Sequence, residues 1–145
     1  IPVYTRRQHY RPLQNWFFFA GFGGSFFAFI NTNLSEMAQI YMSIHYFFAH
    51  GLVIFVMFAL LIDGYRPRWV DYFNAIQWTT ALVVSIIIIN LILGSNYMFT
   101  FEKPPGVNFT LLMPEWPYYF IVILSIGLIF YTLLMLLSLV PQRNK

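Results

Sequence analysis

The 145-residue chain is 59% hydrophobic and only 9% charged, whereas about a quarter of the residues in a soluble domain carry a charge, so a soluble fold is disfavoured. Its lack of cysteine excludes disulfides, thiolate metal sites and a cysteine nucleophile within these residues. The net charge of +3 does not indicate a nucleic-acid partner, because the basic residues flank apolar segments as membrane topology signals do.

Long uncharged apolar runs predict membrane-spanning helices, because a chain inside hydrocarbon must satisfy its own backbone hydrogen bonds. We expect an all-α membrane protein with a folded outer loop at 95–117 and four transmembrane helices at approximately 14–31, 37–62, 72–94 and 118–140. Without an internal repeat, residues 1–145 are interpreted as a single transmembrane helical domain. Because the sequence begins with Ile1 rather than with a methionine, we expect either a processed protein or the C-terminal part of a longer one.

The first apolar segment, Trp16–Ile30, is short. At ~1.5 Å per residue it covers only about 23 Å of a hydrocarbon core of ~30 Å, so a re-entrant helix is an alternative to a full crossing. The segment contains a patch of small residues that would let another helix approach closely, or would allow a kink. These candidate helix-packing residues are Gly21, Gly23, Gly24 and Ser25.

The second segment carries two histidines, His45 and His50, in an apolar run. Polar residues inside spans usually face the bundle, because an unpaired polar group in hydrocarbon is costly. The two imidazoles are about 140° apart around a helix that turns ~100° per residue, so we do not expect them to share a face, and no metal site is predicted. His50 either hydrogen-bonds to a neighbouring helix, with Asn90 as a candidate partner, or is a functional residue.

The third segment and the loop after it carry two further groups of polar residues. Asn74 and Gln77 are three residues apart on one helix face, which favours hydrogen bonding to another helix, so they too are candidate helix-packing residues. A second group would gather where the third span meets the outer loop. It would either bind a polar or anionic lipid headgroup or cap the end of the helix. Its members are Asn90, Asn96, Tyr97 and Lys103.

Basic residues indicate the orientation of the chain. Four crossings place seven of the eight basic residues on one side, and the positive-inside rule makes that side cytoplasmic. We therefore expect a multi-pass protein of the cell membrane (inner or plasma) with both termini in the cytoplasm, and Lys103 as the exception. The seven residues are Arg6, Arg7, Arg11, Arg66, Arg68, Arg143 and Lys145.

Several stretches resemble the bacterial YwaF-type integral membrane family across roughly residues 10–140: "AHGLVIF", "LIDGYRPRW", "NLILGSNYMFTFEKPPG" and "PEWPYYF". The last stretch departs from the family's Pro-Trp-Pro-like element by the inserted Glu115. The resemblance implies further helices upstream with a cysteine-containing motif, which is absent here. Its distant eukaryotic relatives imply acyl transfer on phospholipids by a cysteine and a histidine, and only the histidine carries over, onto His50.

Two functions are compatible with these residues. The first is a structural or accessory subunit that packs against other membrane protein subunits and membrane lipids, without a cofactor or metal. The absence of cysteine and of carboxylates within the spans favours it. The alternative is a lipid-modifying enzyme, most simply an acyltransferase, with His50 as general base, Asn90 orienting it, and Asn96 with Lys103 holding the headgroup. That enzyme needs a nucleophile near His50, either a lipid hydroxyl or a residue outside this sequence.

Overall fold

The computed structural model describes residues 11–30, 40–104 and 109–139. Within these ranges, four helices are long and apolar enough to cross a membrane, which confirms the predicted all-α membrane fold with four spans. The predicted residues 31, 37–39 and 140 of the spans lie outside the described ranges, as do the basic residues Arg6, Arg7, Arg143 and Lys145.

The first span consists of three consecutive helical segments: α2 (Arg11–Trp16), the π-helical η1 (Phe17–Gly21) and α3 (Phe22–Ile30). Its 20 residues are continuous, and at ~1.5 Å rise they cover about 30 Å, which is enough for a full crossing. The span already includes Arg11, the first described residue, and so extends before the predicted residue 14. This difference arises because the Arg11 guanidinium is paired with the carboxylate of Asp71, so a charged residue fits in the first turn.

The remaining spans are α4 (Ile40–Ile62), α5 (Trp69–Leu93) and α6 (Tyr118–Ser138). Helix α5 begins at Trp69, before the predicted residue 72, because the Asp71 carboxylate accepts the backbone N–H of Arg68 and caps the first turn. It ends at Leu93 and is capped by Gly94, whose left-handed backbone (φ 61°) suits a residue without a side chain.

The loop between α5 and α6 is folded, as predicted. It contains two short 3-10 turns, η3 (Tyr97–Phe99) and η4 (Phe109–Leu112). Buried polar groups hold it to the helices: Asn90 of α5 donates to Thr100 Oγ1 at 2.7 Å, and the Tyr119 hydroxyl of α6 donates to Phe99 O at 2.6 Å. We call the side of the molecule with this loop the loop end.

The opposite end holds Arg11, Arg66 and Arg68, and we call it the arginine end. The main hydrophobic core lies in this half of the molecule, where the last part of α6 packs beside the first part of α5. Hydroxyl pairs join these two helices at 2.9 Å, from Tyr72 to Thr132 and from Thr79 to Tyr131. The core residues are Phe18, Phe19, Met57, Tyr65, Tyr72, Ala75, Tyr131 and Met135.

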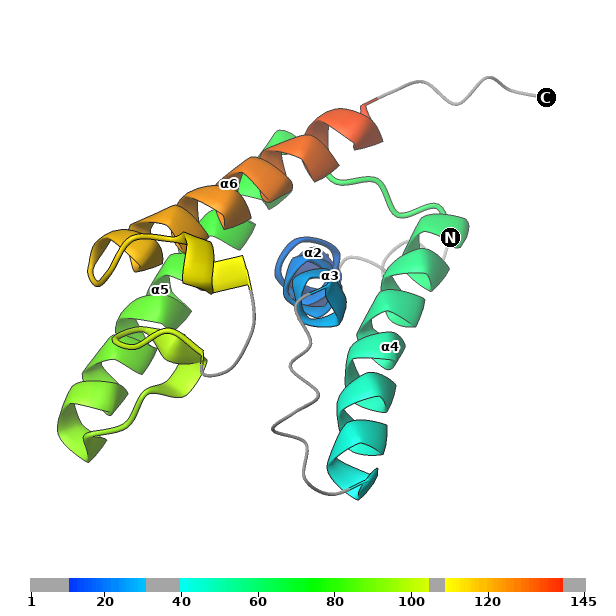
Figure 1. The fold of residues 1–145 in the computed structure, drawn as a ribbon. Coiled ribbons are helices and arrows are strands. Elements are labelled where there is room, and N and C mark those ends of the chain that lie inside the picture. Colours follow the sequence, from blue (N-terminus) through cyan, green and yellow to red (C-terminus); the bar gives the residue numbers. More distant parts are fainter. Residues whose placement is uncertain (1–10, 31–39, 105–108, 140–145) are drawn as a thin grey trace.

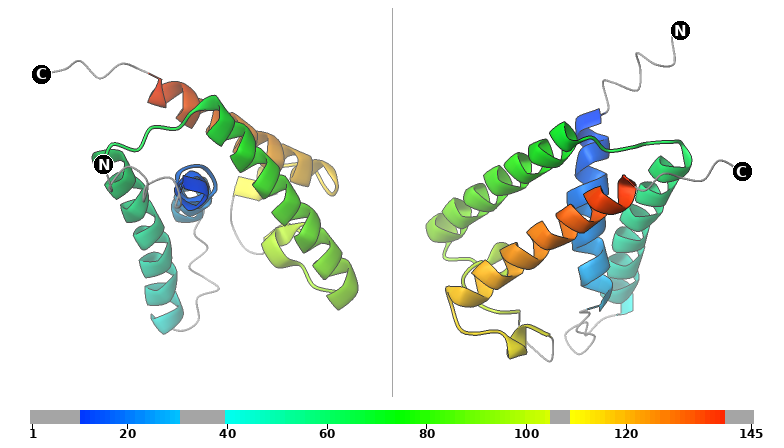
Figure 2. Two further views of the ribbon diagram at one scale, coloured as in Figure 1. Left: turned by 180° about the vertical axis from the view of Figure 1, so that it is seen from behind. Right: turned by 90° about the horizontal axis from the view of Figure 1, so that it is seen from above.

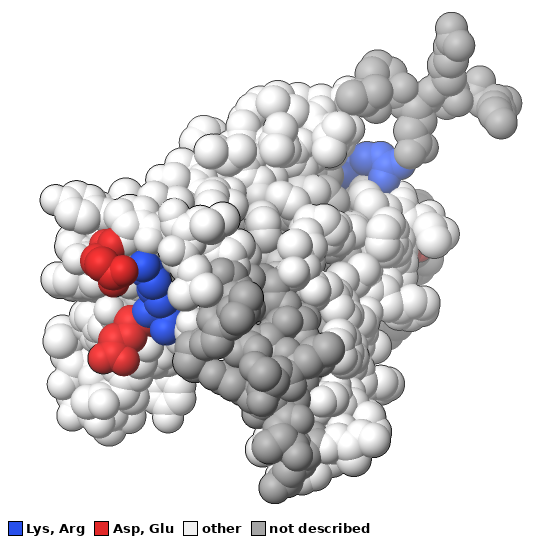
Figure 3. Space-filling model, viewed as in Figure 1, with Lys and Arg blue, Asp and Glu red and all other residues white. Residues whose placement is uncertain are grey.

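The helices diverge toward the loop end. Figures 1 and 2 show α4 on one side of the first span and α5 with α6 on the other, connected at the arginine end by the segment before α5. Figure 3 shows that charged side chains on one face of the molecule lie toward its two ends, with uncharged surface between them. This distribution suits a protein whose middle is surrounded by hydrocarbon.

Candidate functional site

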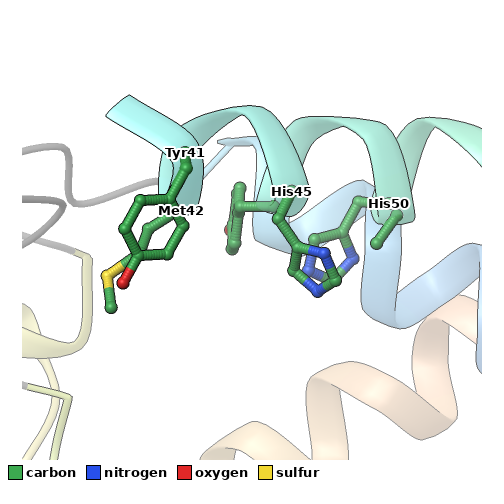
Figure 4. A pocket seen from close by; sticks show the side chains of 6 residues that line it. Tyr41, Met42, His45 and His50 are labelled. Carbon is green, nitrogen blue, oxygen red and sulfur yellow. The ribbon is translucent and has the colours of Figure 1, made fainter. Parts of the chain in front are cut away.

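A groove of about 690 Å³ follows one face of α4 in the half of this helix nearest the loop end. Small-molecule sites commonly have volumes of about 300–1,000 Å³, so the groove is large enough for a ligand. Figure 4 shows four of its side chains projecting from α4 to the same side. Its lining residues within the described part of the chain all belong to this helix: Tyr41, Met42, His45, Tyr46, Ala49 and His50.

Both histidines line this one groove, although five positions on a regular helix separate them by about 140°. The groove is wide enough to include side chains on either side of Tyr46 and Ala49. Nevertheless, no group of three or more His, Cys, Asp or Glu residues in the described ranges has a geometry that could hold a metal ion.

His50 pairs with the first span and not with Asn90. Its Nδ1 atom lies 3.2 Å from the Oγ atom of Ser25, a residue of α3 that is only 3% exposed. Asn90 lies at the far end of α5 and is bonded within the outer loop, which makes the expected His50–Asn90 pair wrong. The structural reason is that α3 runs antiparallel to α4, which also brings the Tyr46 hydroxyl to Ala28 O at 2.7 Å.

Aromatic rings fix the orientation of the His50 side chain. The Tyr46 ring lies edge-on with its centroid 4.5 Å from that of the imidazole, and the Phe29 ring is 6.3 Å away on α3. Together with Ser25, these contacts hold one face of the imidazole while the side chain still lines the groove. An imidazole that is held in this way and borders a cavity can accept or donate a proton there.

The small residues of the first span differ in their surroundings. A methyl group on Gly21 would come within 3.1 Å of Val53 in α4, and one on Gly23 within 3.1 Å of Phe130 in α6. Gly24 faces open space, with no atom within 4 Å of such a methyl group. Two of the glycines therefore lie at close helix contacts, on opposite sides of the first span. Asn74 and Gln77 are exposed on α5, so nothing in the described ranges covers them.

The residues assigned to headgroup binding lie outside the groove and are bonded within the loop. Asn90 is 1% exposed, and its amide oxygen accepts from Ser95 Oγ and from the Tyr97 backbone N–H. The Asn96 side chain accepts the backbone N–H groups of residues 101 and 102. Lys103 donates to Met113 O at 2.9 Å and to Glu115 Oε1 at 2.7 Å. The side chains of Asn90, Asn96 and Lys103 thus stabilise the outer loop, whereas Tyr97 takes part through its backbone.

Sequence reasoning missed Asp71, which is 1% exposed at the arginine end. Its carboxylate accepts from Arg11 Nε at 3.0 Å and from Asn15 Nδ2 at 3.1 Å. The Tyr65 hydroxyl donates to Asn15 Oδ1 at 2.5 Å, and burial together with the Asp71 charge raises the pKa of this hydroxyl above its usual range. The only signal in the sequence is an acidic residue three positions after Arg68 and directly before an apolar run.

Comparisons with known proteins identify a family. The model of the TMEM164 family matches residues 4–136. No curated protein and no solved structure matches the chain. The resemblance to the bacterial YwaF-type family is therefore wrong, because the stretches that suggested it lie within the residues matched by a different membrane family.

Proposed function

The chain belongs to the TMEM164 family and carries four helices able to cross a membrane, and we propose that this multi-pass protein acts on membrane lipids as an acyltransferase. One observation carries the proposal: the His50 imidazole, held by Ser25, lines a groove on a membrane-spanning helix. The sequence alone favours an accessory subunit, because it lacks a cysteine nucleophile. A groove of this size makes room for a lipid hydroxyl to serve as the nucleophile beside His50.

The chemistry follows from the tautomer of His50. When Ser25 Oγ accepts the proton on Nδ1, Nε2 keeps its lone pair and can act as a base. It takes the proton of the attacking lipid hydroxyl while that oxygen bonds to the acyl carbonyl carbon. The imidazolium then returns the proton to the departing ester oxygen as the original carbon–oxygen bond breaks. Ser25 stays bonded to Nδ1 throughout, so we assign it the role of a positioning residue.

The variants His50→Gln and His45→Gln test this function as a matched pair, since both remove an imidazole from the same groove. The assay is acyl transfer from a phospholipid to a lysophospholipid by the full chain in lipid nanodiscs, followed by mass spectrometry. We expect His50→Gln to reduce the rate by about 100-fold or more, which is typical for loss of a general base, and His45→Gln to retain most of it. Full activity in a folded His50→Gln protein would end the proposal.

A second function is favoured by Asn74 and Gln77, whose amide side chains are exposed on the largely apolar helix α5. Amide side chains in a membrane normally bond to another helix, so an accessory role in a complex with other membrane subunits is the competing proposal. Purification of Asn74→Leu/Gln77→Leu from its native membrane distinguishes the two functions. Loss of a defined partner with unchanged lipids would support the accessory role.

We also assign the arginine end to the cytoplasmic side and, with it, both termini, because arginines accumulate on that side of membrane proteins. The absence of cysteine allows a direct test with single-cysteine variants and an impermeant thiol reagent. Leu112→Cys at the loop end should react in intact cells, and Asp63→Cys only after permeabilisation. Labelling of Asp63→Cys but not of Leu112→Cys in intact cells would place the arginine end outside the cell and overturn the assignment.

A further inference from the structure

The geometry points to one-sided loading of the groove: a glycerolipid enters it from the membrane leaflet at the loop end and from no other side. This inference rests on the proposed action on lipids, but it concerns the path of the lipid and not the chemistry of His50. It follows from the difference between the two halves of α4.

The half of α4 nearest the arginine end is closed. Val53 packs so closely against the first span that a methyl group on Gly21 would lie 3.1 Å from it. Met57, one turn further along α4, is buried in the core. Beyond Met57, Leu60 and Leu61 also pack against the core. A lipid in the leaflet at the arginine end therefore meets packed side chains on this side of α4, and the groove ends at His50.

No element of the described ranges closes the half of α4 nearest the loop end. The groove runs from Tyr41 to His50, which at ~1.5 Å per residue is a length of about 13 Å. None of the lining residues is buried, so the groove is continuous with the surface that faces the membrane. His50 lies about 15 Å from the first residue of α4, close to the middle of a hydrocarbon core of ~30 Å. The groove thus connects the surface of one leaflet with the centre of the bilayer.

The lining of the groove indicates the kind of occupant. None of its described lining residues is charged, which argues against a free anion, and the walls that they form are largely apolar. Polar atoms are supplied by two imidazoles and by tyrosine hydroxyl groups, at depths between the surface and the centre. Apolar walls with a few polar groups suit a neutral ester group with its acyl chain. In this arrangement a lipid of the leaflet at the loop end is drawn inward until its ester group reaches His50.

The experiment uses the unmodified chain in vesicles with a single protein orientation. A phosphatidylcholine with a diazirine on its acyl chain is placed in one leaflet only, and the residues labelled on irradiation are identified by peptide mass spectrometry. Ala49 lines the groove, whereas its neighbour Phe48 is 69% exposed outside it at nearly the same depth. Phe48 is therefore the internal control, because acyl chains of both leaflets reach the bilayer centre.

We expect Ala49 to be labelled at least 10-fold more from the leaflet at the loop end than from the other leaflet, and Phe48 to be labelled about equally from both. The variant Ala49→Phe, which fills the groove, should abolish the labelling of groove residues and leave Phe48 unchanged. Equal labelling of Ala49 from both leaflets, or no labelling of it when Phe48 reacts, would overturn the inference. His50→Gln should keep the labelling pattern, so a failure of the proposed chemistry is recognised separately.

Discussion

The arginine end and the loop end are stabilised by different interactions. At the arginine end, a buried carboxylate and an aromatic core join the first span to α5, α6 and the end of α4. At the loop end, neutral amide and hydroxyl groups hold the outer loop to α5 and α6, while α4 packs mainly against α3 among the described residues. The comparison shows how a small membrane protein keeps a groove open: the packing that stabilises it is concentrated at the end away from the groove.

The largest effect should come from Asp71→Asn, which removes the charge that pairs with Arg11. Loss of one partner of a buried ion pair costs about 3–5 kcal/mol, because the other charge stays without compensation. We expect a decrease in the free energy of unfolding of about 3 kcal/mol, measured by denaturation in mixed micelles. The matched control is Glu115→Gln, since Glu115 pairs with Lys103 but its side chain is 89% exposed. A surface pair of this kind contributes about 0–1 kcal/mol, so equal effects of the two variants would contradict the comparison.

A smaller, local effect is expected at the loop end from Asn90→Ala. This substitution removes the amide that bonds to Tyr97 O, Thr100 and Ser95, and leaves buried partners without a hydrogen bond at a cost of about 1–3 kcal/mol. Hydrogen exchange should accelerate in residues 95–102 and remain unchanged around Asp71. Faster exchange at both ends would mean that the two regions are a single cooperative unit.

Helix contact is tested by Gly21→Ala and Gly24→Ala. The first adds a methyl group 3.1 Å from Val53, and the second adds one where no atom lies within 4 Å. Overpacking costs about 1–3 kcal/mol, whereas alanine in an open helical position stabilises by about 0.5–1 kcal/mol relative to glycine. The two variants should therefore shift thermal unfolding in opposite directions. If both variants shift the unfolding temperature in the same direction, then the lack of a side chain at Gly21 is not what allows η1 and α4 to pack closely.

The smallest effect should come from Tyr46→Phe, which loses only the hydrogen bond to Ala28 O. Side-chain hydrogen bonds between helices contribute about 0.6 kcal/mol in a membrane protein. Stability should change by that amount, and the groove should keep its shape because the ring remains beside His50. A loss of several kcal/mol would indicate that α3 and α4 depend on this bond more than on their packing.

The sequence was sufficient to predict the four spans, because apolar runs of this length have only one stable form in hydrocarbon. It was less informative about where they begin. The first and third spans start earlier than predicted because Arg11 and Asp71, 60 positions apart, neutralise each other. The partner of His50 was missed for a similar reason: Ser25 becomes its neighbour only when α3 and α4 are placed antiparallel. The local sequence pattern of one helix cannot reveal such pairs, because they depend on which helices pack against each other in the folded protein.

The π-helical turn of η1 has a consequence for insertions and deletions in the first span. Asn15 before it bonds to Asp71, and Ser25 after it bonds to His50. The π turn therefore sets the angle around the helix axis between the side chains of Asn15 and Ser25. A π turn absorbs one extra residue without rotating the helix beyond it. Regular α-helix across Phe17–Gly21 would swing Ser25 by roughly 100° relative to Asn15. Removing a single residue from this turn should thus be tolerated better than removing one from α3, where a deletion would rotate every later residue of the span by about 100°.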